Sequence, residues 1–335
     1  MEHWLLSRFF IQGEPIELLN KTQLDALERF KHKVEDGEYA FESVPCLCGD
    51  KDGGLLISTR DRYGLAVHTH LCGYCGMMWT SPRMTEDSLK KFYEEDYRLI
   101  YVGSSHAPDT FFRDQIEHGE RIYAFITPRV ERQSRKPLKI FDIGCGAGGT
   151  LLPFKKDNGW LPFGCDLGEE YLNRGRKEGL TLEHGGAASL FQYAPANVVI
   201  LSHVLEHFSN PLESINEISK LITKDGYLYV EVPGIFKIHS TYGDFLLFLQ
   251  NAHLYHFSLS SLSTLMAQAG FKLVDGNEQI SALYQKTENT KVCEGKNEFS
   301  KIKYYIYLTE IYRRTHIGKC VNSLKSSAMK MLRNM

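Results

Sequence analysis

Residues 139–149, KIFDIGCGAGG, decide the fold of this 335-residue chain. A β-branched and aromatic run ends near Asp142, a glycine-rich turn follows, and a helix-like segment begins at Thr150. A strand that leads through glycines into a helix is typical of nucleotide-binding elements, because the backbone can approach the ligand and the first N–H groups of the helix point toward it. The stretch therefore predicts an α/β domain whose ligand lies at the carboxyl end of this strand.

Two carboxylates discriminate between the ligands that such a turn can bind. The glycines alone also satisfy the dinucleotide pattern, but Asp142 would repel a pyrophosphate and could instead pair with an ammonium group. Asp166 follows a second strand-like run, 161–165, where its carboxylate could accept both hydroxyls of a ribose. An ammonium, a ribose and no phosphate describe S-adenosylmethionine (SAM), so we expect SAM as the cofactor.

Four motifs in register resemble those of class I SAM-dependent methyltransferases. DIGCGAG (142–148) is similar to their first motif, and GCDL (164–167) to the acid that ends their second strand. VVILSHVLEH (198–207) is similar to their fourth-strand motif, and GYLYVEVP (226–233) to their fifth strand. This resemblance, over about 138–288, implies a Rossmann-like α/β fold with a seven-stranded, mostly parallel sheet and helices on both faces.

The resemblance also implies which residues bind the cofactor. They are Asp142, Gly144, Gly146, Gly148, Asp166, Leu167, Ala187 and Ser202. One position departs from the family: the turn GGAA (185–188) lacks the acid that many relatives offer to the adenine amine.

Alternation of strand-like and helix-like segments predicts the elements of this sheet. Strands are expected at 140–144, 161–165, 180–184, 197–202, 226–232, 271–275 and 281–286, and helices are expected to begin near 150, 169, 211 and 259.

Two cysteine pairs mark a separate module at 44–82. Four thiolates suit a tetrahedral structural zinc ion with no open position, as in a zinc ribbon, and strand-like segments lie between the pairs. The expected ligands are Cys46, Cys48, Cys72 and Cys75. The first pair is C-x-C instead of C-x-x-C, so His68 or His70 could replace Cys46, and ordinary buried thiols are the alternative. With 77–83 and 92–97, the module resembles a zinc-binding segment fused to methyltransferases that often act on sugars or other small metabolites.

The remaining segments are expected to be helical. Residues 1–43 form a lead-in with Leu24, Leu27, Phe30 and Val34 on one face, residues 83–135 form a cap, and residues 136–290 form the SAM-binding domain. In the cap, Tyr97 and Tyr101 could lie over the SAM sulfonium or simply pack in the core. Residues 291–335 read as a basic amphipathic tail whose stripe contains Ile317, Val321, Leu324, Ala328 and Leu332. Such a tail could bind a membrane surface, associate with another copy or pack on its own domain.

Two histidine-rich segments are candidates for the chemistry. Histidine titrates near neutral pH, so it can accept a proton from the acceptor molecule. We favour His207 and His253 as bases, with His203 and Glu206 orienting them, and Tyr255 or His256 as the alternative. H-x-x-E-H (203–207) also matches an inverted zinc-peptidase motif, but it directly follows a strand instead of lying on a helix. It also resembles the metal-binding E-x-x-E-H of some methyltransferases, with His203 replacing the first acid.

Composition limits the function classes. A net charge of −2 implies no general attraction to nucleic acid, and no apolar run is long enough to span a bilayer. The N-terminal residues read as mature protein instead of a signal peptide, and paired cysteines favour a reducing, cytoplasmic location. We therefore expect a SAM-dependent methyltransferase acting on oxygen or carbon of a sugar or nucleotide-sugar. A macromolecular methyltransferase that reads RNA or protein through the cysteine module, or a non-catalytic SAM-binding scaffold, is the alternative.

Overall fold

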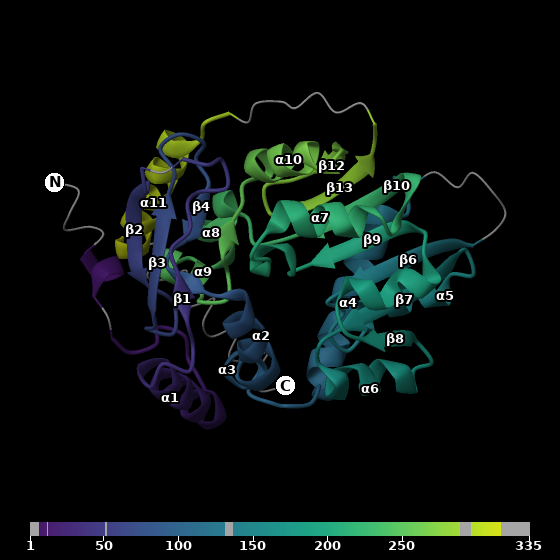
Figure 1. Ribbon diagram of the computed structural model, residues 1–335, viewed down its shortest axis with the longest axis horizontal. Coiled ribbons are helices and arrows are strands. Elements are labelled where there is room, and N and C mark those ends of the chain that lie inside the picture. The colour runs from purple at the N-terminus through teal and green to yellow at the C-terminus, as the bar shows by residue number, and fades with distance from the viewer. Residues whose placement is uncertain (1–6, 12, 51, 131–136, 289–295, 316–335) are drawn as a thin grey trace.

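The protein is described by a computed structural model over residues 7–11, 13–50, 52–130, 137–288 and 296–315. Its two main sheets lie at opposite ends of the molecule (Figure 1), with helices α2 (Glu86–Glu95) and α3 (Tyr97–Tyr101) between them. None of the described helices combines the length and the hydropathy that a bilayer-spanning segment needs.

The larger sheet has seven strands in the order β12-β13-β10-β9-β6-β7-β8. The strands are β6 (Leu138–Ile143), β7 (Trp160–Asp166), β8 (Thr181–His184), β9 (Ala196–Ser202), β10 (Ile222–Glu231), β12 (Phe271–Gly276) and β13 (Ser281–Lys286). Only β13 is antiparallel to its neighbours. β6 and β9 are parallel, and the order in which successive strands are added to the sheet reverses between them. The Rossmann-like fold expected from the sequence is confirmed, and the ligand is expected at that reversal point.

Helices cover both faces of this sheet because successive strand residues alternate between them. Ile140 and Val198 pack with Ile122 of α4 (Asp109–Ile126), whereas Phe141 and Val199 belong to the core under α7 (Pro211–Ser219) and α10 (Leu259–Gln268). The other helices of this part are α5 (Leu152–Lys156) and α6 (Glu169–Lys177). Short 3-10 turns follow the glycine loop (η2, Gly149–Leu151), β8 (η3, Ala187–Tyr193) and β9 (η4, Leu205–His207).

The smaller sheet is antiparallel, in the order β11-β4-β3-β2. Its strands are β2 (Leu55–Arg60), β3 (Ala66–Leu71), β4 (Met78–Thr80) and β11 (Tyr255–His256). β11 comes from the segment that follows the fifth strand of the larger sheet, so this sheet is not built from 44–82 alone. A separate pair joins β1 (Phe41–Glu42) to β5 (Arg83–Met84).

Segments from both ends of the described chain pack on the smaller sheet. Phe9 of η1 (Ser7–Phe10) and Ile306 of α11 (Phe299–Arg314) share one buried cluster with Ile57 and Met78. The short helices α8 (Ile238–Thr241) and α9 (Phe245–Phe248) complete this cluster, after the turn η5 (Ile235–Lys237). The described part of the expected tail therefore packs on its own chain, whereas the stripe from 317 to 332 lies outside the described residues.

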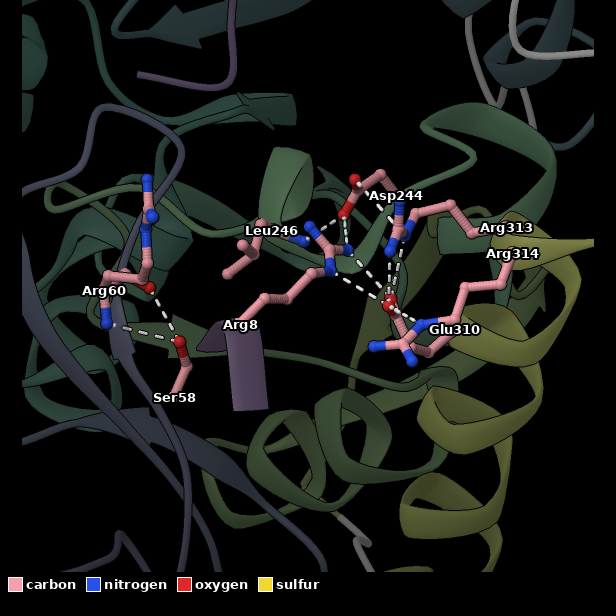
Figure 2. Close-up of polar contacts among 8 residues, drawn as sticks. All are labelled: Arg8, Ser58, Arg60, Asp244, Leu246, Glu310, Arg313 and Arg314. Atoms are coloured by element: carbon pink, nitrogen blue, oxygen red, sulfur yellow. Dashed lines mark hydrogen bonds and ion pairs between the residues drawn. The ribbon is translucent and has the colours of Figure 1, made fainter. Parts of the chain in front are cut away.

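A buried carboxylate fixes α11 to this cluster. Glu310 is 0% exposed and accepts from Arg8 at 2.8 Å and from Arg313 at 2.6 Å. Arg314 adds a contact at 3.1 Å, and Arg8 also pairs with Asp244 (Figure 2). The network ties the first and last described helical segments together.

The expected lead-in helix is α1 (Lys21–Glu35), which begins at a capping box between Asn20 and Gln23. Leu27 and Phe30 are buried as the helical spacing predicts, although Leu24 stays largely exposed.

Candidate functional site

The glycine loop after β6 has the backbone that a close ligand approach requires. Gly144, Gly146 and Gly148 all have positive φ, at 74°, 57° and 78°. A Cβ on Gly144 would lie 2.5 Å from Val204 Cγ2, so a side chain there would also collide with the turn after β9. The amide N–H of Gly144 donates to the Cys165 carbonyl at 2.8 Å, which holds the loop against the end of β7.

Asp142 lies beneath this loop at the end of β6 and is buried. Burial, and then the nearby charge of Asp166, raises the pKa of Asp142 well above its usual value. A cation beside the carboxylate would stabilise its ionised form. The position thus fits a ligand that brings a positive charge, as the ammonium of SAM does.

Asp166 ends β7, but its oxygens already have partners. Oδ2 accepts from the Gly146 N–H at 2.8 Å, and Oδ1 accepts from the Gly168 N–H at 2.8 Å. The Arg98 guanidinium of α3 also donates to Oδ1, at 3.1 Å, and lies over the Tyr171 ring. A ribose that used this carboxylate, as the sequence predicts, would share or displace the Arg98 contact.

The other predicted cofactor residues lie at the same edge of the sheet. Leu167 is exposed, and its carbonyl contacts His184 Nε2 at 3.0 Å. Ala187 begins η3. Ser202 ends β9, and its hydroxyl donates to Glu231 at 3.4 Å.

Three histidines surround Glu206 on the turn after β9. From Glu206 Oε1, His203 Nδ1 lies at 3.6 Å, His207 Nε2 at 3.9 Å and His253 Nε2 at 3.8 Å. Glu206 is 1% exposed, and neither of its oxygens has a hydrogen-bond partner among the described residues. The structure thus brings together the four residues that the sequence proposes for the chemistry.

These histidines differ in how far a molecule in solution can reach them. The His203 side chain is 51% exposed, against 12% for His207 and 5% for His253. His203 also has a left-handed φ of 56°, a conformation that is rare outside glycine and typical of functional positions. Partial burial opposes protonation of His203, but Glu206 and then Glu231 outweigh it and raise its pKa.

His207 and His253 are fixed by contacts that leave ring nitrogens facing Glu206. Nδ1 of His207 lies 2.8 Å from the Ala252 carbonyl and must donate to it, so Nε2 carries the lone pair. The His253 carbonyl accepts from the Thr80 hydroxyl of β4 at 3.0 Å. Burial, and then the neighbouring His207, lowers the pKa of His253 well below its usual value.

Sequence reasoning missed His118 and Glu231, which meet beside His203. His118 Nε2 of α4 lies 2.7 Å from Glu231 Oε2 at the end of β10, and the Tyr229 hydroxyl donates to the same oxygen at 3.1 Å. Burial would raise the pKa of Glu231, but the hydrogen bond from His118 and the nearby His203 lower it. Glu231 could have been suspected as an acid at a strand end, whereas no pattern marks His118.

Of the aromatic and His256 candidates, Tyr101 is exposed, whereas Tyr255 and His256 are buried. Tyr97 stacks on Tyr101 with centroids 5.4 Å apart and also contacts the His207 ring. Tyr255 and His256 are buried in β11, and the Tyr255 hydroxyl contacts Arg83 at 2.9 Å. Tyr255 and His256 thus support the smaller sheet.

The four cysteines of the predicted zinc site lie together. The Cys46 and Cys75 sulfurs are 3.5 Å apart and those of Cys48 and Cys72 are 3.7 Å apart, close to the roughly 3.8 Å between thiolates of a tetrahedral zinc site. Backbone N–H groups of Cys75 and Met77 point at sulfur, at 3.5 and 3.4 Å. The donor set fits zinc, and Cys46 belongs to it.

His70, the alternative ligand, is engaged elsewhere. Its Nδ1 contacts the Gly53 carbonyl at 2.8 Å and its Nε2 contacts the Ser81 carbonyl at 2.9 Å. The ring also stacks on Trp79.

Comparison with known protein families gives a match that includes the candidate site. Residues 109–275 match a protein family described as a methyltransferase domain. That stretch contains the glycine loop, both carboxylates, the histidines around Glu206 and the pair His118–Glu231. No curated protein sequence matches the chain.

Solved structures with a similar fold include three enzymes. The 1,6-didemethyltoxoflavin-N1-methyltransferase of Burkholderia thailandensis is 15% identical, with a TM-score of 0.44, covering 66% of this chain and 99% of that one. The magnesium protoporphyrin IX methyltransferase of Synechocystis is 15% identical, with a TM-score of 0.42, covering 61% and 100%. A cyclopropane synthase of Mycobacterium tuberculosis is 15% identical, with a TM-score of 0.39, covering 51% and 74%.

Proposed function

Because residues 109–275 form a class I SAM-dependent methyltransferase domain, we propose that this enzyme methylates a hydroxyl or an acidic carbon of a small sugar or nucleotide-sugar. The observation that supports this proposal best is the group of imidazoles and carboxylates beside the glycine loop. A hydroxyl or a carbon acid must lose a proton during methyl transfer, and such groups are suited to accept it.

Bound SAM would supply a methyl group on a positively charged sulfur. In our proposal the carboxylate of Asp142 faces the ammonium group of the cofactor. The backbone of Gly144 and Gly146 allows the cofactor to approach. Asp166 accepts hydrogen bonds from the ribose after the Arg98 guanidinium has moved away from its carboxylate. Ser202, Leu167 and Ala187 line the remaining contacts.

We assign the base to His203, in place of the His207 and His253 favoured by sequence reasoning. His203 is the one of these three imidazoles that a molecule from solution can readily reach. Glu206 at 3.6 Å on one side, and the Glu231–His118 pair on the other, would stabilise the imidazolium after proton transfer. In this scheme His207 and His253 lie behind Glu206 and do not touch the acceptor.

We also propose that Cys46, Cys48, Cys72 and Cys75 bind one structural zinc ion. All four positions of a tetrahedral site would be filled by the protein, so this ion would have no position left for a substrate.

Two variants test the methyltransferase proposal. In calorimetry with S-adenosylhomocysteine (SAH), the demethylated product of SAM, Asp166→Ala should weaken binding by about 1–3 kcal/mol, because contacts to the ribose are lost. His203→Ala should leave SAH affinity nearly unchanged. It should lower the turnover of a nucleotide-sugar that the wild-type enzyme methylates by roughly 10²–10⁴-fold. His106→Ala, at an exposed histidine of the cap, is the control. Absence of SAH binding by the wild-type chain would refute the cofactor, and full turnover by His203→Ala would refute the base.

A further inference from the structure

The residues behind His203 carry a second inference. We propose that Glu206, His207 and His253 form a site for one divalent transition-metal ion, separate from the four cysteines. The three residues come from η4 and from the segment that leads into β11, and one ligand atom of each lies within 4.8 Å of the others.

The first argument is the environment of Glu206. An ionised carboxylate is costly to bury unless it is hydrogen-bonded, paired or bound to a metal. Both Glu206 oxygens are buried without a hydrogen-bond partner among the described residues, and so are Nδ1 of His253 and the hydroxyl of Tyr93. The Tyr93 ring packs edge-on against His207, so these polar atoms belong to one enclosed place.

The second argument is the spacing of the ligand atoms. His207 Nε2 and His253 Nε2 lie 3.9 and 3.8 Å from Glu206 Oε1, which is too long for a hydrogen bond. Ligand atoms around a tetrahedral ion with bonds of about 2.1 Å lie roughly 3.4 Å apart, so a closure of about half an ångström would suffice.

The third argument is the tautomer of His207. Histidines that bind metals usually donate their other ring N–H to a carbonyl or carboxylate, which orients the ring and directs the lone pair to the ion. Nδ1 of His207 makes this contact with Ala252, at 2.8 Å. The side-chain amide of Gln250 contacts Nε2 of His253, and an ion bound at this nitrogen would displace that contact.

Two imidazoles and one carboxylate favour a borderline ion such as Zn²⁺, Fe²⁺, Co²⁺ or Mn²⁺, and they leave coordination positions open. The ion would hold Glu206 and the two imidazoles in place behind His203. This role rests on the proposed function, whereas the binding of the ion does not.

The experiment uses full-length protein whose cysteines are already loaded with zinc, titrated with Co²⁺. Cobalt bound by nitrogen and oxygen gives visible ligand-field absorption without the thiolate charge-transfer band that exchange into the cysteine site would produce. We expect one Co²⁺ per chain. Glu206→Gln and His207→Gln should each weaken its binding by more than the roughly 10–100-fold typical of changes outside the ligand shell. His106→Ala should bind Co²⁺ as the wild type does.

Failure of the wild-type chain to bind Co²⁺, Mn²⁺ or additional Zn²⁺ in calorimetry would overturn the site, and so would unchanged Co²⁺ affinity in both variants. Circular dichroism identifies a variant that does not fold, in which case the other variant decides. SAH calorimetry on the same samples separates the two proposals: SAH binding without Co²⁺ binding refutes only the metal site, and the reverse refutes only the proposed function.

Discussion

The two sheets of this protein are assembled in opposite ways. The larger sheet uses consecutive strand–helix units, and all of its strands lie between Leu138 and Lys286. The smaller sheet takes three strands from 55–80, a fourth from 255–256, and its packing partners from η1 and α11. The larger sheet is a local construction, whereas the smaller one exists only when distant segments of the chain meet. A substitution in the smaller sheet should therefore also destabilise segments that are distant from it in the sequence.

Loss of a cysteine should give the largest effect. Structural zinc contributes on the order of 10–16 kcal/mol to the folding of small zinc domains, so Cys72→Ser should lose the metal, the smaller sheet and solubility. Metal analysis and near-ultraviolet circular dichroism measure this. Tyr74→Ser, at an exposed residue of the same turn, should change neither signal. A Cys72→Ser protein that keeps its zinc and its unfolding midpoint would show that the smaller sheet is independent of the cluster.

Removal of the Glu310 carboxylate should give the next effect. Glu310→Gln breaks a buried ion-pair network that fixes α11 to η1, and we expect a loss of about 3 kcal/mol in the free energy of unfolding. Urea unfolding measures the loss. The control is Glu217→Gln, which breaks an exposed pair with Lys220 and should cost less than about 1 kcal/mol. Equal effects of the two substitutions would mean that α11 adds nothing to the smaller sheet.

The same carboxylate gives this contact a pH dependence. Burial would raise the pKa of Glu310, but hydrogen bonds from Arg313 and Arg8 outweigh it and lower the pKa from 4.5 to about 2. A carboxyl whose pKa is lower in the folded state stabilises the fold above its unfolded pKa, and this stability is lost as the pH falls. The wild type should therefore lose stability between pH 4.5 and about 2 more steeply than Glu310→Gln.

The smallest effect is expected at the helix between the two sheets. Arg98 of α3 holds the carboxylate that a ribose would use, so Arg98→Ala should tighten SAH binding by up to about 1 kcal/mol, or roughly fivefold. Calorimetry measures the change, with Arg174→Ala, which removes exposed pairs with Asp109 and Glu178, as the control. Weaker SAH binding by Arg98→Ala would mean that α3 contributes a direct contact to the cofactor.

The same contrast explains what the sequence could predict. The sequence predicts all seven strands of the larger sheet to within a few residues, because strand-like and helix-like segments alternate regularly along this part of the chain. The glycine loop and Asp142 can be recognised because they follow directly on the first of these strands. β11 was missed because it has two residues and forms only where β4 offers an edge. Burial could not be read either, so His203 was ranked below His207 and His253, and the partnership of His118 with Glu231 depends on a helix docking 113 positions away.

Because β11 pairs with β4, the candidate site depends on residues that precede the matched methyltransferase domain. The family match begins at residue 109, but Thr80 donates to the His253 carbonyl at 3.0 Å and its N–H donates to Leu254 at 2.9 Å. A truncated chain that starts at 109 would keep the whole Rossmann-like sheet and lose the scaffold that positions His253. The smallest autonomous unit that can hold this site is thus larger than the recognisable methyltransferase segment, and grafting that segment alone into another protein would transfer the fold without an intact site.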